Sequence, residues 1–124
     1  MPTQPSKELG TFPNPHPNNS YTVRFSTEEF TTICPMTGQP DFAQVTVEYE
    51  PDQACLESKS IKLYLWSFRN EGHFHEDVTN ILLNDMVRAC SPRWMTITGH
   101  YNIRGGIDFT ITARYKKEPP AASS

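Results

Sequence analysis

Cys34 begins the segment Cys-Pro-Met-Thr-Gly-Gln-Pro-Asp, which ends at Asp41. Pro35 keeps Cys34 out of a helix, and the Pro, Thr and Gly residues of this segment favour a tight reversal of the chain. Such a reversal lets Asp41 fold back toward the thiol, which predicts a nucleophilic cysteine beside a proton donor. The alternative is that Cys34 is a small buried apolar side chain and Asp41 an ordinary turn residue.

A second polar segment runs from Glu57 to Tyr64 and reads Glu-Ser-Lys-Ser-Ile-Lys-Leu-Tyr. Its lysines and serines stand at a predicted helix start, where free backbone N–H groups and positive charge suit a phosphate. The alternative is a solvated helix start capped by Ser58 or Ser60. The sequence has no Gly-x-Gly-x-x-Gly pattern, so a nicotinamide nucleotide would bind here without a Rossmann fold.

Titratable groups are concentrated in the segment His73-Phe-His-Glu-Asp77 at the start of a second predicted helix. The spacing is not that of a zinc-binding helix, so we predict no metal site. The functional interpretation is a buried carboxylate, Glu76, that faces the N–H groups of a planar ligand and accepts hydrogen bonds at both oxygens. The alternative is that Glu76 and Asp77 only complement the helix dipole.

Arg104-Gly-Gly106 precedes the last predicted strand. The glycines permit close approach, and the Arg104 guanidinium suits a phosphate. A hairpin turn explains the same glycines equally well.

Alternating and helical patterns predict the elements that hold these segments. Alternation predicts strands over 21–26, 45–50, 94–98 and 107–114, and spacing of three and four predicts helices over 60–68 and from 73 to the Ser91-Pro92 stop. The order β-β-α-α-β-β indicates an α+β fold in which two helices cover one face of a four-stranded antiparallel sheet. Its outer strands need partners, which identical neighbours in a ring would supply.

Composition limits the remaining possibilities. The 124 residues suit one domain, predicted over 21–115, between a Pro-rich extended arm (1–20) and a flexible tail (116–124). The hydrophobic fraction of 36% is low, which favours self-association, and the net charge of −3 argues against direct binding of nucleic acid. The start shows no leader and no apolar run could span a membrane, so we expect a soluble protein. The three cysteines lack Cys-x-x-Cys spacing, which suits the reducing cytoplasm.

The polar segments together resemble a family of nitrile reductases, which convert 7-cyano-7-deazaguanine to 7-aminomethyl-7-deazaguanine with NADPH on the route to queuosine in tRNA. Its signature Glu-(Ser/Leu)-Lys-(Ser/Ala)-apolar-Lys-(Leu/Tyr)-aromatic is met from Glu57 to Tyr64. The other motifs are matched by Cys34 with Asp41, by Phe74-His75-Glu76 and by Arg104 to Gly106. The four motifs occur in the family's order, and the resemblance covers about residues 20–115.

The resemblance implies the tunnelling fold in its single-unit form, assembled typically as two stacked pentamers with sites between subunits. It implies that Cys34 adds to the nitrile carbon while Asp41, helped by His75, protonates the nitrogen to a thioimide, which two NADPH then reduce. The implied substrate contacts are Phe74, Glu76 and a neighbour's Glu57 and Ser58. The implied contacts to NADPH phosphates are Lys59, Ser60, Lys62 and Arg104.

Three alternatives are compared with this family. An amidine-forming relative attacks the same nitrile with Cys and then uses ammonia, but it lacks the Glu-Ser-Lys-Ser signature that is intact here. A non-catalytic purine-binding module would not need Cys34, Asp41, His75 and Glu76 together. Zinc-dependent tunnelling-fold hydrolases match less well because their metal ligands are missing.

Overall fold

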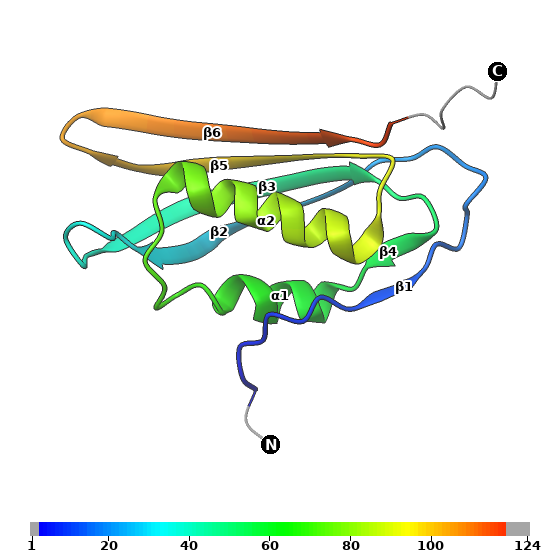
Figure 1. Ribbon diagram of the computed structural model, residues 1–124, viewed down its shortest axis with the longest axis horizontal. Coiled ribbons are helices and arrows are strands. Elements are labelled where there is room, and N and C mark those ends of the chain that lie inside the picture. The colour runs from blue at the N-terminus through cyan, green and yellow to red at the C-terminus, as the bar shows by residue number, and fades with distance from the viewer. Residues whose placement is uncertain (1–2, 119–124) are drawn as a thin grey trace.

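The computed structural model describes residues 3–118, with both helices on one face of an antiparallel sheet (Figure 1). Along this part of the chain the elements are β1 (Thr11–Pro13), β2 (Val23–Ile33), β3 (Pro40–Glu50), β4 (Ala54–Leu56), α1 (Ser58–Trp66), α2 (His75–Cys90), β5 (Trp94–Arg104) and β6 (Ile107–Lys116). The main sheet has the order β2-β3-β5-β6. This confirms the predicted four-stranded architecture and the β-β-α-α-β-β unit of the tunnelling fold.

The first hairpin extends beyond the predicted strands. Strand β2 continues to Ile33 and β3 begins at Pro40, so the long loop expected between 26 and 45 is only a short turn. The register shifts between Thr27 and Phe30, which marks a bulge. A bulge inserts an extra residue and interrupts the alternation of faces, which is why the sequence pattern ended too early.

A short two-stranded sheet was not predicted. Strand β1 pairs with β4 in antiparallel register, with Thr11 opposite Leu56. Strands of three residues are too short to show a periodic pattern, and their pairing depends on residues far apart in the sequence.

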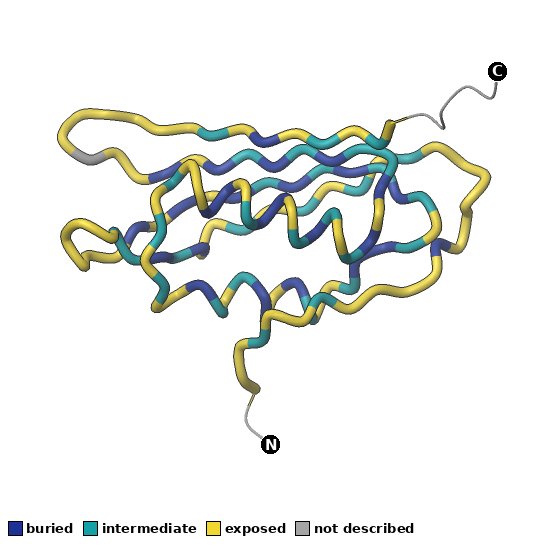
Figure 2. The backbone as a smooth tube through the Cα atoms, viewed as in Figure 1, coloured by how far each residue is buried: buried dark blue, intermediate teal, exposed yellow. Residues whose placement is uncertain are grey.

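The core lies between the main sheet and the helices. Figure 2 shows buried positions alternating along the strands and following the inner sides of both helices. Fully buried side chains from the central strands are Val45, Val47, Tyr49, Met95 and Ile97, and the helices add Tyr64, Val78, Leu82 and Met86. Packing of these apolar surfaces holds α1 and α2 on the sheet.

The described part of the N-terminal arm lies along α1 rather than pointing away. Glu57 N–H donates to Gly10 O at 2.9 Å, Gly10 N–H donates to Ser60 Oγ at 2.9 Å, and Ser6 N–H donates to Leu63 O at 3.2 Å. These contacts link the arm to the helix that carries the Glu-Ser-Lys-Ser segment.

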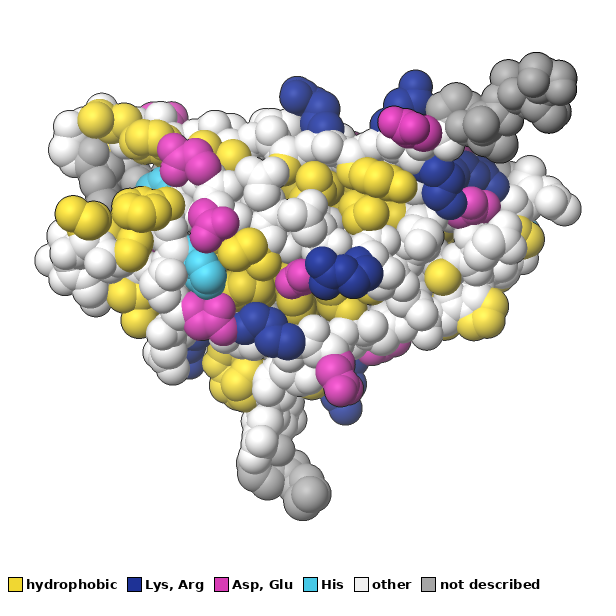
Figure 3. All heavy atoms as spheres, viewed as in Figure 1, with side chains coloured by type: hydrophobic (Ala, Val, Ile, Leu, Met, Phe, Trp, Pro, Cys, Tyr) yellow, Lys and Arg dark blue, Asp and Glu magenta, His cyan; other side chains and the backbone are white. Residues whose placement is uncertain are grey.

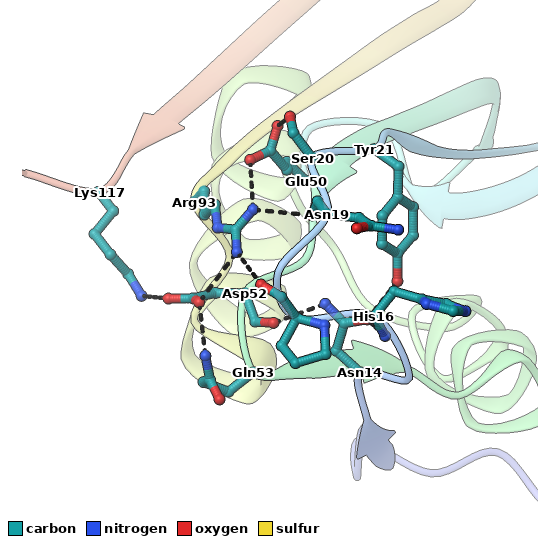
Figure 4. Close-up of polar contacts among 11 residues, drawn as sticks. Asn14, His16, Asn19, Ser20, Tyr21, Glu50, Asp52, Gln53, Arg93 and Lys117 are labelled. Carbon is teal, nitrogen blue, oxygen red and sulfur yellow. Dashed lines mark hydrogen bonds and ion pairs between the residues drawn. The ribbon is translucent and has the colours of Figure 1, made fainter.

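Arg93 holds the rest of the arm at one end of the sheet (Figure 4). Its guanidinium donates to Pro17 O at 2.7 Å and to Asn19 O at 3.2 Å. The same group pairs with Glu50 at 3.0 Å and with Asp52 at 3.7 Å. One side chain thus joins the arm, the end of β3 and the start of β5.

At the C-terminal side, β6 extends to Lys116, and Lys117 Nζ contacts Asp52 at 2.8 Å. The predicted flexible tail began at residue 116, and its residues 119–124 lie outside the described part. None of the helices in residues 3–118 has the length and apolar character needed to cross a membrane.

Candidate active site

Cys34 lies directly after β2, in the turn that leads to β3. Its N–H donates to Gln39 O and its carbonyl accepts from Gly38 N–H, both at 2.8 Å. Gly38 has φ 73°, a left-handed conformation that glycine adopts without strain. The Pro-Met-Thr-Gly sequence therefore forms the predicted reversal and presents a half-buried thiol at the end of the sheet.

The Cys34 thiol is activated by its own turn. The hydroxyl of Thr37 and the N–H groups of Met36 and Thr37 interact with the sulfur and lower the pKa of Cys34. The negative charge of Asp41 acts in the opposite direction and raises this pKa, by a smaller amount. Hydrogen bonds that favour a thiolate increase the nucleophilicity available near neutral pH.

Asp41 is a strand residue and not part of the turn itself. It is 6% exposed on the helix-facing side of β3, opposite Thr32 of β2. The Thr32 hydroxyl is buried without a hydrogen bond to any described residue. A buried carboxylate and a buried hydroxyl thus lie on the same face of the hairpin that presents Cys34.

His75 begins α2 and points toward this carboxylate. Its Nε2 lies 3.5 Å from Asp41 Oδ2. The imidazole stacks on Tyr101 with ring centroids 4.0 Å apart, and the Phe109 ring lies nearly perpendicular to it at 5.5 Å. Tyr101 and Phe109 were not predicted as site residues because alternation along β5 and β6 marks them only as strand residues.

The connection between the helices is bound to the strand that carries the thiol. Ile33 N–H donates to Glu71 O at 2.9 Å, and His73 N–H donates to Ile33 O at 3.1 Å. Gly72 thereby forms a parallel bridge with Ile33, the residue before Cys34. This bridge brings the Phe-His-Glu motif, far away in the sequence, beside the Cys34 turn.

Phe74 and Glu76 flank His75 and are accessible. Phe74 is 55% exposed, and its carbonyl accepts the N–H of Val78 in the first turn of α2. Glu76 is exposed in the same turn, as is Asp77, so the carboxylate predicted to be buried is accessible to solvent in this chain. Both carboxylates complement the helix dipole, and Glu76 has oxygens accessible to a ligand.

Glu57 is the N-cap of α1, so the predicted cap at Ser58 or Ser60 is wrong. Its Oε2 accepts Lys59 N–H at 2.7 Å and its Oε1 accepts Ser60 N–H at 2.8 Å. These backbone hydrogen bonds lower the pKa of Glu57. The longer Glu side chain reaches both donors from the position before the helix, an arrangement that the serine preference for N-caps did not suggest.

The Glu57 segment and the Cys34 turn lie at opposite ends of the sheet. Helix α1 begins beside β4, whereas the β2–β3 turn and the start of α2 lie at the other end (Figure 1). The structure thus brings Cys34, Asp41 and His75 together within one chain, with Phe74 and Glu76 on either side of His75. It does not bring Glu57, Ser58, Lys59, Ser60 or Lys62 to them.

The expected cofactor residues differ in availability. Lys59 and Lys62 are exposed on α1. The Ser60 hydroxyl already donates to Glu57 O at 2.8 Å and accepts from Gly10 N–H. Arg104 ends β5, and its side chain lies outside what the structure describes.

A groove of about 860 Å³ runs between the outer strand β2 and α1. It extends from Ser58 and Lys62 on α1 to Gly38 in the Cys34 turn. Apolar side chains form much of its surface, among them Phe25, Phe30, Ile61, Leu65 and Trp66. We refer to it as the β2–α1 groove.

Exposed apolar side chains also gather at the Cys34 end of the molecule. Figure 3 shows them where the β2–β3 and β5–β6 turns project. The exposed large apolar residues of these turns and their flanks are Met36, Phe42, Ile103, Ile107 and Phe109. Within residues 3–118, no three His, Cys, Asp or Glu side chains come together as ligands for a metal ion.

One β-β-α-α-β-β unit, with a thiol of lowered pKa near a buried carboxylate and an imidazole, defines a tunnelling-fold protein with a candidate site centred on a cysteine. The family model described as QueF-like protein matches residues 40–120. The chain belongs to this family.

Relatives match almost the whole chain. One from Thermomicrobium roseum is 58% identical over 98% of this chain and 96% of its own length, and one from Syntrophus aciditrophicus is 59% identical over 92% and 81%. Both carry the name NADPH-dependent 7-cyano-7-deazaguanine reductase. A solved archaeosine synthase QueF-Like in the apo form has a TM-score of 0.72 and 26% identity, covering 79% of this chain and 96% of that one.

Proposed function

We propose that the protein is an NADPH-dependent reductase that converts the nitrile of 7-cyano-7-deazaguanine to the amine of 7-aminomethyl-7-deazaguanine, in the biosynthesis of queuosine. The observation that carries this proposal is the Cys34 thiol, whose pKa is lowered by its turn, beside Asp41 and His75. The relatives of that name, at 58% and 59% identity, support the choice of substrate.

The residues of the chain account for the activation of the nitrile. The Cys34 sulfur forms a bond to the nitrile carbon, one π bond of the C≡N group breaks, and the nitrogen takes a proton. This proton comes from the pair formed by Asp41 and His75, in which Oδ2 and Nε2 lie 3.5 Å apart. The product is a thioimide, in which the carbon accepts hydride more readily than it does in a nitrile.

The cofactor of this proposal is NADPH. When bound, it supplies hydride to the thioimide carbon, and the four-electron change from nitrile to amine requires two molecules. The exposed ammonium groups of Lys59 and Lys62 fit its phosphates. The Ser60 hydroxyl is the third proposed contact to the phosphates, and this contact requires loss of the hydrogen bond from Gly10 N–H. Arg104 is the fourth proposed contact.

Substrate binding in this proposal uses two subunits. Glu76 anchors the guanine-like edge, Phe74 covers the heterocycle, and Glu57 with Ser58 comes from a neighbouring copy. The supporting observation is that the start of α1 and the Cys34 turn lie at opposite ends of one subunit (Figure 1). If both segments contact the same substrate molecule, they come from two different copies.

We further propose that the copies form a ring, as two stacked pentamers. Strands β2 and β6 are the outer strands of the sheet, and within residues 3–118 their outer edges pair with no further strand, apart from the bridge of Ile33 to Gly72 at the end of β2. Pairing β2 with β6 of the next copy satisfies both edges and covers the β2–α1 groove. The free cysteines Cys34, Cys55 and Cys90 support a reducing cytoplasm as the location.

The test is nitrile-dependent oxidation of NADPH by the purified full chain, followed by nicotinamide absorbance. We expect two NADPH consumed per nitrile and, without NADPH, an adduct on Cys34 visible by intact mass. Cys34→Ala is expected to lose both signals. Cys55→Ala is the matched control, because Cys55 is buried and takes no part in the reaction. Oxidation that does not depend on the nitrile would overturn the proposal.

A second candidate is the amidine-forming reaction, because a synthase has the same fold at a TM-score of 0.72. The same assay separates the two. Formation of the Cys34 adduct, its release as an amidine with free Cys34 when ammonia is added, and no oxidation of NADPH would support the second candidate.

A further inference from the structure

The His75 ring lies flat on the Tyr101 ring, with an interplanar angle of 12° and centroids 4.0 Å apart. Tyr101 is 2% exposed on β5, so this stacked face is shielded from solvent. Phe109 of β6 is the Cα partner of Tyr101 and also contacts the imidazole, with its ring tilted by 71°. Two adjacent strands therefore provide an aromatic support for the first residue of α2.

A chain of hydroxyl groups holds Tyr101 and His75 together. Thr79 Oγ1 donates to His75 O at 2.7 Å and lies 2.7 Å from the Tyr101 hydroxyl oxygen. A threonine hydroxyl has only one proton, so with Thr79 donating to His75 O the Tyr101 O–H is left to donate to Thr79 Oγ1, and it also lies 3.4 Å from His75 O. Burial raises the pKa of Tyr101, which keeps this donor protonated.

Gly99 makes room for this arrangement. A Cβ at position 99 would lie 2.8 Å from Tyr101 Cε1, 3.1 Å from its hydroxyl oxygen and 3.2 Å from Thr79 Oγ1. Residues 99 and 101 share one face of β5, and the tyrosine ring lies back along the strand over the glycine. Any larger residue at position 99 displaces the ring or the threonine.

We infer that Tyr101 is a positioning residue that fixes the plane of the His75 imidazole, with Thr79 and Gly99 as its supports. Three constraints act on His75: its carbonyl is bound by Thr79, its ring lies on Tyr101, and its Nε2 lies 3.5 Å from Asp41. Stacking on the flat Tyr101 ring hinders rotation of the imidazole out of this plane, which would move Nε2 away from the Asp41 carboxylate. The inference rests on the proposed function, in which the Asp41–His75 pair supplies a proton.

The test compares single and double variants of the full chain in the nitrile assay. Tyr101→Leu removes the aromatic support and is expected to lower kcat about tenfold or more while KM changes less, because small misplacements of a catalytic group are costly. Tyr101→Phe retains the support and is expected to recover most of this loss. In a His75→Gln background, Tyr101→Leu is expected to lower kcat no further, because Tyr101 acts through the imidazole, which this background already lacks.

Matched controls separate positioning from general stability. Tyr64→Phe removes a hydroxyl between the two helices, which donates to Asp85 Oδ2 at 2.5 Å and has no role in the proposed site, and is expected to leave kcat unchanged. Gly99→Ala retains every functional group and displaces the ring, so it replaces Tyr101→Leu if that variant does not fold. Carbethoxylation of His75, followed by peptide mass spectrometry, is expected to be faster in either variant, whatever the activity.

The outcomes distinguish the inference from the proposed function. If the wild type oxidises NADPH and His75→Gln is slow, but Tyr101→Leu and Gly99→Ala are as fast as the wild type, the inference is wrong and the function stands. Additive losses in the double variant also overturn the inference. If the wild type shows no nitrile-dependent oxidation, the proposed function fails, and unchanged carbethoxylation in the variants then overturns the positioning role as well.

Discussion

The Nε2 atom of His75 lies 3.5 Å from Oδ2 of Asp41 and so joins the start of α2 to the start of β3. The two residues meet because Gly72 bridges Ile33 and brings the interhelical connection to the end of the first hairpin. Asp41 is buried, and the Cys34 thiol, whose pKa is lowered by its turn, lies directly after β2 in the same hairpin. In the proposed mechanism, this pair supplies the proton that the nitrile nitrogen takes when the Cys34 sulfur adds to the carbon.

Asp41→Asn tests this pair. An amide of similar size cannot exchange protons as a carboxyl group can, so the proposed proton transfer is lost and adduct formation on Cys34 is expected to slow about 100-fold or more. The measurement is intact mass against time without NADPH. Asp108→Asn is the control, because Asp108 forms a similar pair with His100 at 2.6 Å on the exposed part of the sheet. Equal rates for Asp41→Asn and the wild type would contradict a role for Asp41.

Thr37→Val tests the activation of the thiol. The Thr37 hydroxyl makes the largest contribution to the lowered pKa of Cys34. Its removal destabilises the thiolate, so the pH midpoint of Cys34 alkylation is expected to rise toward the ordinary value of 9.0. Burial raises the pKa of Cys90 to about 12, so Cys90 does not compete near neutral pH. Thr98→Val is the control, and a midpoint that does not move in Thr37→Val would show that the hydroxyl is unimportant.

Glu57→Gln tests the cap of α1. Folding lowers the pKa of Glu57, so its stabilising effect is fully present above the ordinary value of 4.5 and is lost as pH falls through the folded value. The variant is therefore expected to have a lower Tm at neutral pH and the same Tm as the wild type in acid. Glu8→Gln, in the exposed part of the arm, serves as the control. A Tm difference that persists unchanged in acid would disprove this assignment.

Arg93→Ala tests the attachment of the arm. The variant loses hydrogen bonds to Pro17 O and Asn19 O and the ion pair with Glu50, so the free energy of unfolding is expected to fall by about 1–3 kcal/mol. Urea unfolding measures this loss, and proteolysis within residues 14–20 is expected to accelerate. Arg88→Ala is the control, because Arg88 is exposed and its pair with Asp85 contributes less than about 0.5 kcal/mol. Equal losses in the two variants would argue against a special role for Arg93.

Trp66→Lys tests the proposed ring. Trp66 is 38% exposed in the β2–α1 groove, and a charge there is expected to weaken assembly if a neighbour covers the groove. Size-exclusion chromatography with light scattering measures the mass. Phe12→Lys is the control, since Phe12 is 44% exposed on β1 and does not line the groove. An unchanged mass for Trp66→Lys would show that the groove is not an interface.

Local sequence patterns correctly predicted the order of the main elements and the reversal of the chain after Cys34. Alternation at Val45, Val47 and Tyr49 and the helical spacing of Val78 and Leu82 report which face is buried, because burial follows the period of each element. The same reasoning failed at the Thr27–Phe30 bulge, where an extra residue changes the face without changing the composition.

The family resemblance implied that Asp41 and His75 act together, but the residue patterns did not show which groups meet, and only the tertiary structure gives their contacts. The contact between Asp41 and His75, the Tyr101 support with its space over Gly99, and the Glu57 cap all depend on distances between segments or on the reach of a side chain. A periodic pattern records how each residue faces solvent and carries no information on which distant residue lies opposite. Only closure of the hairpins and packing of α2 on the sheet supply that information.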